Sequence, residues 1–488
     1  MILGLSLAFG IISVLIGMSI FSNFQQSKLL EGENKPEIEL AICILSARDN
    51  FAQRDVIRNT WLKSIQEINV KSNATILAKF VIGNEACPFP REDRIDKEAC
   101  QQWIPSISSE DHKKSISAFK ILPQKSPLRT KAVFSVYFKV LHDIILQRVG
   151  LAQLDDLLLD FKNLDVAMYD SVSEEEVSRV TFNAEQRGRD HHGYNYRPLP
   201  GLKLPKGYEF ILELDIDYSF RKTFPLYFEN TTQEGHFNIL RSEFLHNDGT
   251  RIIDTSDRPW FPLVSVMFTV ADVDTLTQHI DTRGQRGAQW KGEMEKTSQR
   301  LHFEQEEHGD ILMVDLQDIY RNLPNKLLQC HNWLEKHFKA NHVMKTDDDC
   351  WVNVKGISQR INKHHQNSMW WWGHFRRSWP VERHGKWRES LYPSPVYPTF
   401  ACGSANIVSR DIHIWLSNHL NRLRHFQGED VSMGIWLAGL EVHLEDDIAW
   451  SCDETCQQDS LVIAQLTPKE IWTYWNNTNM CDKPCDSC

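Results

Sequence analysis

The sequence predicts an α/β protein in which a sheet domain is interrupted by a β-rich insertion and preceded by a transmembrane helix. Two almost continuous apolar runs, 38–45 and 76–82, flank a segment with helical character, which is the pattern of a βαβ unit. Short alternating strands then fill residues 101–280, and the α/β pattern resumes from residue 281. These three observations carry the fold prediction.

The start of the chain predicts a membrane anchor over residues 1–24. No charged side chain occurs before Lys28, and an apolar run of about 20 residues is long enough to cross a bilayer as a helix. A cleaved signal peptide is the alternative, although its apolar region is usually only about 7–15 residues long. A polar stem over 25–37 follows. The short N-terminal tail favours a lumenal location for the rest of the chain.

Composition excludes two classes of protein. The chain has 41% hydrophobic and 24% charged residues, which is typical of a folded protein and not of a disordered one. Its formal net charge of -11 argues against a nucleic-acid partner, because proteins that bind nucleic acids neutralise phosphates with lysine and arginine.

The sheet domain is predicted in two parts, residues 38–100 and 281–488. The first part has the two buried strands and a helix over 51–66 between them, which is the opening of a nucleotide-binding sheet. The second part begins with a polar helix over 286–307 and a buried strand over 311–314.

The insertion over 101–280 shows the period of two that half-buried strands have. Its clearest run alternates strictly with polar residues, at Tyr208, Phe210, Leu212, Leu214 and Ile216. Short strands joined by polar turns predict an antiparallel β-sandwich.

Three adjacent aspartates, Asp347, Asp348 and Asp349, follow a short apolar strand. Ligands of open α/β sheets bind beyond the carboxyl ends of the strands. Adjacent carboxylates repel one another unless a cation lies among them, and alternate residues of an extended chain point to the same side. Carboxylates and substrate phosphates together are common ligands of Mg²⁺ and Mn²⁺. Asp347 and Asp349 are therefore predicted metal ligands, with a solvated acidic loop as the alternative.

Glu429 and Asp430 open a helix-like run that ends near residue 440. Acidic residues at a helix N-terminus often serve only as caps or complement the helix dipole. A carboxylate there is also able to accept a proton from a sugar hydroxyl as a general base. The residues alone leave both interpretations open.

Tryptophans gather between these two acidic motifs. Flat aromatic side chains stack on the C–H face of a sugar ring, although burial in the core is an equal alternative for each of them. The residues concerned are Trp370, Trp371, Trp372, Trp379 and Trp387, the last of which follows Lys386.

Eleven cysteines indicate an oxidising compartment. Cys87 and Cys100 bracket a loop and five more cysteines crowd the C-terminus, which we interpret as disulfides; a zinc site in the tail is the alternative. Three acceptor sequons for N-glycosylation agree with a lumenal location, at Asn73, Asn230 and Asn476.

Several motifs, in this order, resemble those of the β-1,3-glycosyltransferase (galactosyltransferase) family. The resemblance covers residues 38–100 and 285–450. The motifs are Arg-x-x-Ile-Arg-x-Thr-Trp from Arg54, Phe-Val-Ile-Gly from Phe80, Gly-Asp-Ile from Gly309, Lys-x-Asp-Asp-Asp from Lys345 and Glu-Asp-Val-x-x-Gly from Glu429.

The resemblance implies a GT-A (Rossmann-like) fold, a UDP-sugar donor, Mn²⁺ as cofactor and an inverting reaction that forms a β-1,3 link. By position, Asp349 would bind the metal together with Asp347, and Asp347 and Asp348 would face the nucleotide. Asp430 would be the catalytic base, with Glu429 beside it.

The same resemblance extends to the substrates. Arg54 and Arg58 would shape the uridine-diphosphate pocket, and Lys386, Trp387 and Gly403 would form the sugar platform. The family type implies UDP-GalNAc as donor and a terminal β-linked GlcNAc of an O-mannosylated glycoprotein as acceptor. It also implies a single-pass location in the endoplasmic reticulum or Golgi membrane, with the catalytic domain in the lumen.

The sequence departs from the family pattern in three ways. The family motif Tyr-Pro-Pro-Tyr-x-x-Gly-x-Gly-Tyr keeps Tyr397 and Gly403 but has Ala405 and Asn406 at its end. Cys452 stands where the family usually has a metal-binding histidine, so that Cys452 either binds metal or forms a disulfide, with His443 a weaker candidate ligand. The insertion has no counterpart in ordinary members.

Two other functions remain open from the residues. The motifs do not fix the donor, so UDP-galactose or UDP-GlcNAc is the nearest alternative. A protein of another class, a lumenal sugar-binding protein without turnover, would keep the fold but would not need Asp347, Asp349 and Asp430.

Overall fold

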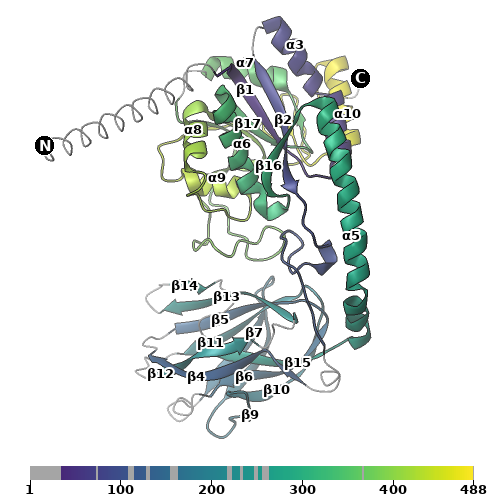
Figure 1. Cartoon of the computed structure of the whole chain (residues 1–488). Helices are drawn as coiled ribbons and strands as arrows, with labels where there is room; N and C mark the ends of the chain where they lie inside the picture. The colour runs from purple at the N-terminus through teal and green to yellow at the C-terminus, as the bar shows by residue number, and fades with distance from the viewer. Residues whose placement is uncertain are drawn as a thin grey trace, which may run out of the picture.

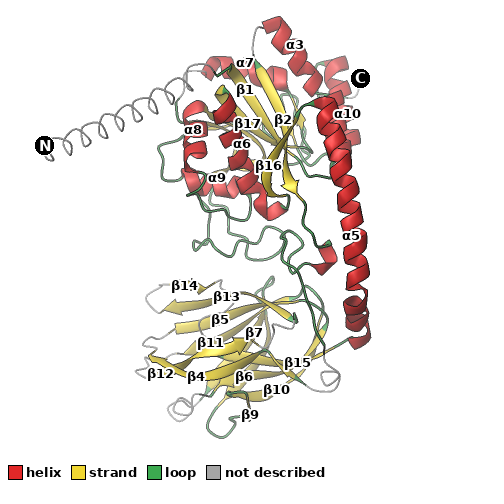
Figure 2. Ribbon diagram, in the orientation of Figure 1, coloured by secondary structure: helices red, strands yellow, loops and turns green. Residues whose placement is uncertain are grey.

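The computed structural model describes residues 35–72, 75–107, 115–127, 132–153, 163–216, 223–230, 235–246, 251–254, 263–364 and 368–486. It has two lobes (Figure 1), and the long helix α5 (Val273–His308) runs alongside both of them. The upper lobe mixes helices and strands and the lower lobe consists of strands (Figure 2). A mixed α/β fold with a β-rich region is thus confirmed.

The upper lobe is built on a seven-stranded sheet with the order β16-β2-β1-β17-β20-β19-β21. The first four strands are parallel, and β20 is antiparallel to both of its neighbours. Leu45 pairs with Asp347 in the parallel register of β1 and β17, so both parts of the predicted domain form one sheet. The strands are β1 (Glu37–Leu45), β2 (Ile76–Glu85), β16 (Ile311–Gln317), β17 (Lys339–Asp347), β19 (Trp370–Arg376), β20 (Phe400–Ser409) and β21 (His443–Asp446).

Helices cover both faces of this sheet, because each presents an apolar stripe to it. Buried side chains of α2, α3, α7 and α10 pack on one face, and those of α6, α8 and α9 pack on the other. The helices are α2 (Phe51–Asn59), α3 (Leu62–Ser72), α6 (Leu323–His337), α7 (Val354–His364), α8 (Arg410–His419), α9 (Glu429–Leu437) and α10 (Pro468–Cys481), with short turns η1 (Arg91–Asp93) and η3 (Tyr320–Asn322). A two-stranded ribbon pairs β18 (Trp351–Val352) with β22 (Val462–Ile463).

The predicted helix over 51–66 is in fact two helices. The chain leaves helical geometry at Thr60, whose hydroxyl donates to the Val56 carbonyl at 2.6 Å. Trp61 then turns inward, becomes fully buried and donates its indole N–H to the Cys350 carbonyl at 3.0 Å. Burial of this large side chain outweighs the helical pattern at this point.

The lower lobe is a β-sandwich within the predicted insertion. A five-stranded sheet (β3-β15-β6-β10-β9) faces a six-stranded sheet (β14-β13-β5-β11-β7-β8), and apolar side chains of both sheets form one core. Phe210, Leu212 and Leu214 point into this core, as their alternation predicted. The strands are β3 (Ile116–Ser117), β4 (Phe119–Pro127), β5 (Ala132–Val140), β6 (Ile144–Ala152), β7 (Leu164–Asp170), β8 (Glu176–Phe182), β9 (Arg189–His191), β10 (Tyr194–Leu204), β11 (Glu209–Ile216), β12 (Thr223–Asn230), β13 (Phe237–His246), β14 (Arg251–Asp254) and β15 (Val264–Val270).

Helix α5 begins earlier than the predicted range of 286–307. Asp272 caps its N-terminus by accepting from the Thr275 N–H, and Gly309 ends it in a left-handed conformation. The helix has 36 residues, which at about 1.5 Å per residue is long enough to accompany both lobes. Its first turns lie inside the range assigned to the insertion by the sequence pattern.

Four disulfides join described residues: Cys43–Cys330, Cys87–Cys100, Cys402–Cys452 and Cys456–Cys485. The predicted disulfide of the 87–100 loop is confirmed, and the pairing of Cys456 with Cys485 removes two thiols from the alternative zinc site in the tail. Among the described residues, Cys350 is the free thiol, and it is buried.

The predicted membrane anchor over 1–24 lies outside the described residues. Within the described ranges, no helix has the length and apolar character needed to cross a membrane.

Candidate active site

A pocket of about 490 Å³ opens at the carboxyl end of β17, between β20 and the start of α9. Open α/β sheets bind ligands at this edge. The predicted site residues that line it are Asp347, Asp349, Lys386, Trp387, Gly403, Glu429 and Asp430.

Lys345 lies at the centre of the carboxylate cluster. Its buried ammonium contacts Asp347 Oδ1 at 2.8 Å and Glu429 Oε1 at 2.6 Å, and it donates to the Gly403 carbonyl. Burial opposes its charge, but the carboxylates of Asp347 and Glu429 raise the pKa of Lys345. Lys345 therefore stays protonated and holds β17, β20 and α9 together at the pocket. It is a site residue that the sequence analysis used only as part of a motif.

Asp347 and Asp349 both line the pocket. Burial raises the pKa of Asp347, and the charges of Glu429 and Asp349 add to the rise, while Lys345 opposes it. Independently of this shift, the carboxylates of the described lining outnumber its cations, since Asp347, Asp349, Glu382, Glu429 and Asp430 face only Arg376 and Lys386, with Lys345 behind them. A divalent cation held by Asp347 and Asp349 would remove this imbalance, so the residues present fit Mn²⁺ or Mg²⁺.

Asp348 lies apart from its two neighbours. It is buried and accepts a hydrogen bond from Asn50 Nδ2 at 2.9 Å, and it does not line the pocket. Burial raises the pKa of Asp348, although hydrogen bonds from Ser46 and Asn50 oppose the shift. The structure therefore gives Asp348 a contact with the loop after β1, and its predicted contact with a nucleotide stays a prediction.

Asp430 is half-buried in the first turn of α9, beside Glu429. Burial, followed by the charge of Glu429, raises the pKa of Asp430 to about 7. The N-cap of α9 is Gly428, with no side-chain cap, so neither acid is the capping residue. A carboxylate with a pKa close to neutral suits a general base, because it is both substantially ionised and basic near pH 7.

Gly403 lets the backbone of β20 approach both acids closely. A Cβ atom at Gly403 would lie 3.4 Å from Asp430 Oδ2 and 3.5 Å from Glu429 Oε1. The glycine thus leaves the carboxylates open to the pocket.

The wall opposite the carboxylates comes from the loop 377–399 between β19 and β20. Trp379 is 40% exposed and Trp387 is 53% exposed, and both line the pocket. Lys386 Nζ lies 4.6 Å above the ring centroid of Tyr320. Arg376 covers one face of Trp379, 4.8 Å from its ring centroid. The exposed parts of Trp379 and Trp387 offer an apolar surface to a sugar ring.

The three consecutive tryptophans of β19 are buried in the core and do not line the pocket. Trp370, Trp371 and Trp372 are each at most 1% exposed and belong to the core on the two faces of the sheet. Their interpretation as a sugar platform is wrong, because strand alternation buries successive side chains on opposite faces of a covered sheet.

Two polar atoms of the pocket lining were not anticipated from the sequence. Tyr397 Oη and Gln427 Oε1 are buried and have no hydrogen-bond partner among the described residues, and both side chains line the pocket. Buried polar groups normally find a partner, so these atoms are suited to a hydroxyl group of a ligand. The only sequence signals were Tyr397 in the altered family motif and Gln427 directly before Gly428.

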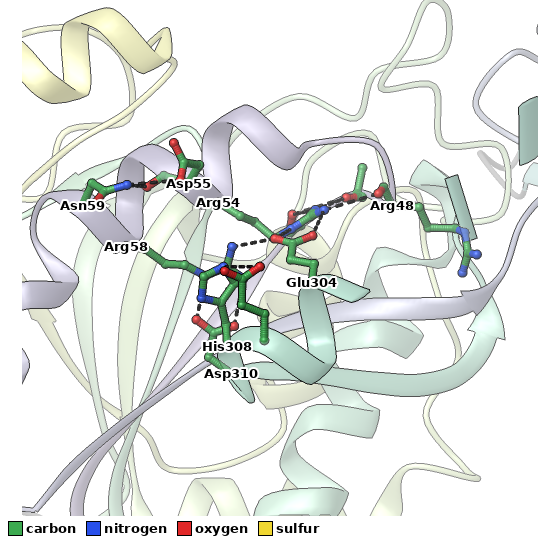
Figure 3. A network of polar contacts seen from close by, with 11 residues as sticks. Arg48, Arg54, Asp55, Arg58, Asn59, Glu304, His308 and Asp310 are labelled. Atoms are coloured by element: carbon green, nitrogen blue, oxygen red, sulfur yellow. Dashed lines mark hydrogen bonds and ion pairs between the residues drawn. The ribbon is translucent and has the colours of Figure 1, made fainter. Parts of the chain in front are cut away.

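Arg54 and Arg58 belong to a separate polar network, which Figure 3 shows together with Glu304 and Asp310. Arg54 is fully buried and pairs with Glu304 of α5 at 2.8 Å. Arg58 pairs with Glu304 at 2.6 Å and with Asp310 at 2.8 Å. Neither arginine lines the pocket, but the charge of Arg54 acts on the buried Asp348 and opposes the rise of its pKa. The two arginines connect α2 to α5, and their predicted role at the uridine-diphosphate stays a prediction.

Cys452 resolves one of the open alternatives. It forms a disulfide with Cys402 in the pocket wall, so it offers no thiolate to a metal. His374 lies beside this disulfide, with its Nδ1 3.4 Å from Cys452 Sγ. Because both cysteines of the group His374, Cys402 and Cys452 are oxidised, only His374 of the three could bind a metal ion. His443 is exposed on β21 and does not line the pocket.

The sequons differ in what the structure describes. Asn476 is exposed on α10, where a glycan has room. Asn230 is the last residue of β12, and Asn73 lies outside the described residues.

The profile of the galactosyltransferase family matches residues 290–447, which include every pocket carboxylate. UDP-GalNAc:β-1,3-N-acetylgalactosaminyltransferase 2 of Xenopus tropicalis is 32% identical over 460 residues, covering 92% of this chain and 91% of the relative. The human protein of that name is 32% identical over 465 residues, covering 92% and 89%. β-1,3-Galactosyltransferase 6 of Mus musculus is 30% identical over 178 residues, covering 35% and 55%.

Proposed function

Because the chain belongs to the galactosyltransferase family of β-1,3-glycosyltransferases, we propose that it transfers N-acetylgalactosamine from UDP-GalNAc to a terminal β-linked GlcNAc of a glycoprotein glycan. The reaction inverts the configuration at the anomeric carbon of the transferred sugar and forms a β-1,3 link. The relatives that match nearly the whole chain carry this donor and linkage in their names. The O-mannosyl type of acceptor glycan is part of the same proposal.

The observation that carries the proposal is the pocket cluster around Lys345. Lys345 fixes Asp347 and Glu429 at hydrogen-bond distance, and the pKa of the adjacent Asp430 is about 7. An inverting displacement needs a base on one side of the sugar carbon and a stabilised leaving group on the other side. In this pocket, Asp430 is the candidate base, and Asp347 and Asp349 are the candidate ligands of a cation that would stabilise the leaving group.

In this proposal, Asp430 accepts the proton of the acceptor hydroxyl as that oxygen attacks the sugar carbon. Glu429 keeps the basicity of Asp430 high through its negative charge, and Lys345 holds Glu429 in position. Mn²⁺ held by Asp347 and Asp349 would supply positive charge to the departing diphosphate. Lys386, Trp387 and Gly403 bound the space for the acceptor sugar, and Tyr397 and Gln427 offer polar atoms to its hydroxyls.

The proposed location is the lumen of the endoplasmic reticulum or Golgi, with residues 1–24 as a single-pass anchor. Four disulfides between described residues support an oxidising compartment. The exposed Asn476 sequon agrees with it. Expression of the chain with a reporter glycosylation site near the C-terminus, followed by alkaline carbonate extraction, tests both parts; a soluble or unglycosylated product would contradict them.

The test of the function is a matrix of donors and acceptors. UDP-GalNAc, UDP-galactose and UDP-GlcNAc are each assayed with Mn²⁺ against β-GlcNAc, β-galactose and β-GalNAc acceptors. We expect transfer with UDP-GalNAc and the β-GlcNAc acceptor, and a β-1,3 link by NMR of the product. Preference for another donor would support the alternative galactosyl- or N-acetylglucosaminyltransferase. Binding of sugars without turnover of any donor would support the non-catalytic alternative.

A further inference from the structure

The pocket wall that carries Lys386 and Trp387 has little structure of its own. Residues 377–399 contain a single isolated β-bridge, between Pro380 and Val396, and otherwise only turns and bends. Backbone hydrogen bonds close the loop on itself, among them one from the Glu389 N–H to the Glu382 carbonyl at 2.7 Å, so the position of the closed loop against the rest of the protein depends on side-chain contacts. What fixes the turn at 384–388 therefore decides where this wall of the pocket stands.

The second half of the loop is fastened within the upper lobe. Glu389 is buried and accepts backbone hydrogen bonds from Tyr392 at 3.1 Å and from Gln427 at 2.8 Å. Arg383 donates to the carbonyls of Glu389 and Ser394 at 2.8 and 2.9 Å. These bonds connect the loop to the entrance of α9, but they do not involve Lys386 or Trp387.

Within the turn, Lys386 lies over the ring of Tyr320, which also shares a side-chain hydrogen bond with Trp387. Arg388 adds a further attachment, and part of that contact comes from the lower lobe. Arg388 Nη1 lies 3.3 Å from Oε1 of Glu209, the first residue of β11. Arg388 Nη2 lies 3.7 Å from Asp96 Oδ2, and the Arg388 carbonyl accepts from Arg321 at 3.0 Å. Figure 1 shows loops at the lower end of the upper lobe turned toward the β-sandwich.

The Glu209 contact is largely shielded from water. The side chains of Glu209 and Arg388 are 6% and 11% exposed, and Lys139 Nζ also approaches Glu209 at 3.0 Å. Ion pairs shielded from solvent are screened little by salt, and loss of one partner leaves the other charges uncompensated. Removal of Glu209 would leave Lys139 and Arg388 facing each other without their shared carboxylate.

We propose that Glu209 of the β-sandwich is a positioning residue for the pocket, which holds the Lys386–Trp387 wall in place through Arg388 and thereby sets the affinity for the acceptor glycan. This inference rests on the proposed function, because it assigns that wall to the acceptor. The carboxylates of the donor side depend on Lys345 instead, within the upper lobe. Through Glu209, which does not line the pocket itself, the insertion thus contributes to the site.

The test is the variant Glu209→Gln, which keeps the shape of the side chain and removes its charge. The KM for the β-GlcNAc acceptor should rise on the order of tenfold, because a small displacement of a positioning group is costly. The KM for UDP-sugar hydrolysis without acceptor should stay within about twofold, as expected when only acceptor contacts change. Hydrogen–deuterium exchange of the peptide 384–388 should become faster.

Glu176→Gln is the matched control, since it removes an exposed carboxylate of the same lobe that pairs with Arg179; it should change none of these quantities. Arg388→Lys, which keeps the charge but loses the forked geometry, should reproduce the effect if Glu209→Gln fails to fold. Unchanged exchange and unchanged acceptor KM would overturn the inference, and so would an equal rise of both KM values. Exchange is measurable even if no transfer is found, so failure of the proposed function is distinguishable from failure of this inference.

Discussion

Two buried clusters of charged residues invite comparison, one at the pocket and one between α2 and α5. In the second cluster, which we call the arginine brace, Arg54 and Arg58 share Glu304, and Arg58 also pairs with Asp310. At the pocket, Lys345 contacts Asp347 and Glu429. The described lining holds five carboxylates, those of Asp347, Asp349, Glu382, Glu429 and Asp430, against the cations Arg376 and Lys386. One cluster is balanced in charge and the other has an excess of carboxylates.

The pKa values reflect this difference. In the brace, burial opposes ionisation of Glu304, but hydrogen bonds from Arg54 and Arg58 lower its pKa. In the pocket, burial and neighbouring carboxylates raise the pKa of Asp347 and of Asp430. A balanced cluster stabilises the fold, whereas an unbalanced one is ready to take up a cation or a proton. Charged residues of the family motifs therefore stand in two different electrostatic settings.

The largest expected effect belongs to the pocket. Asp430→Asn removes the base but keeps the shape, so kcat for transfer should fall by about 10³-fold. UDP binding, measured by calorimetric titration, should remain nearly unchanged. Asp459→Asn, an exposed change outside the pocket, is the control. Near-normal turnover of Asp430→Asn would show that another group is the base.

The brace should respond in stability and not in chemistry. Glu304→Gln leaves Arg54 buried with its charge uncompensated, which should cost about 3 kcal/mol of unfolding free energy. Urea denaturation measures this loss. Glu306→Gln, a change of an exposed residue two positions further along α5, is the control. Wild-type stability with reduced donor affinity would instead restore the predicted role of these arginines at the nucleotide.

The pH dependence of that stability has a definite sign. Because the folded-state pKa of Glu304 is lowered, its contribution is complete above the unfolded value near 4.3. It is lost as the pH falls through the lower folded-state value. Glu304→Gln should lack this acid-side loss.

Asp349→Ala tests the excess of negative charge at the pocket. Changes of residues that only support metal ligands typically weaken metal binding by roughly 10–100-fold. Loss of the ligand itself should therefore weaken Mn²⁺-dependent UDP binding by more than that. Titration of UDP with and without Mn²⁺ measures the effect. If the wild type and Asp349→Ala bind UDP with the same affinity in the presence of Mn²⁺, Asp349 does not hold the metal.

The pH profile of kcat/KM should show the coupling of the two acids. Asp430 acts in its ionised form, so activity should rise with pH through an apparent pKa near 7. Glu429→Gln removes a charge that raises this pKa, so the acidic limb should move to lower pH in the activity that remains. An unmoved limb would show that Asp430 and Glu429 are not coupled.

The smallest effect is expected for Tyr397→Phe. The hydroxyl has no partner among the described residues, so its removal should not lower the unfolding free energy. If the hydroxyl donates to a sugar substrate, loss of that hydrogen bond, worth about 0.5–1.5 kcal/mol, would raise the KM for that substrate several-fold. A drop in stability with unchanged KM values would show that the hydroxyl serves the fold.

The sequence anticipated much of the fold because its signals are local. The apolar runs at 38–45 and 76–82 became β1 and β2, and the alternation at Phe210, Leu212 and Leu214 became β11. The early start of α5 was missed although its N-cap, Asp272, is a local signal. The break at Thr60 was missed because it depends on the packing of Trp61 against distant residues. The burial of Trp370, Trp371 and Trp372 had the same cause.

For the site, the sequence by itself determined which acids follow a strand or open a helix, and Asp347, Asp349, Glu429 and Asp430, though not Asp348, line one pocket. Only the tertiary structure decided their partners. Arg54 meets Glu304, 250 positions away, Cys452 meets Cys402, and Arg388 meets Glu209 of the β-sandwich. Periodicity within a segment encodes which face is buried, but the charge that compensates a buried group comes from whichever element the fold brings beside it.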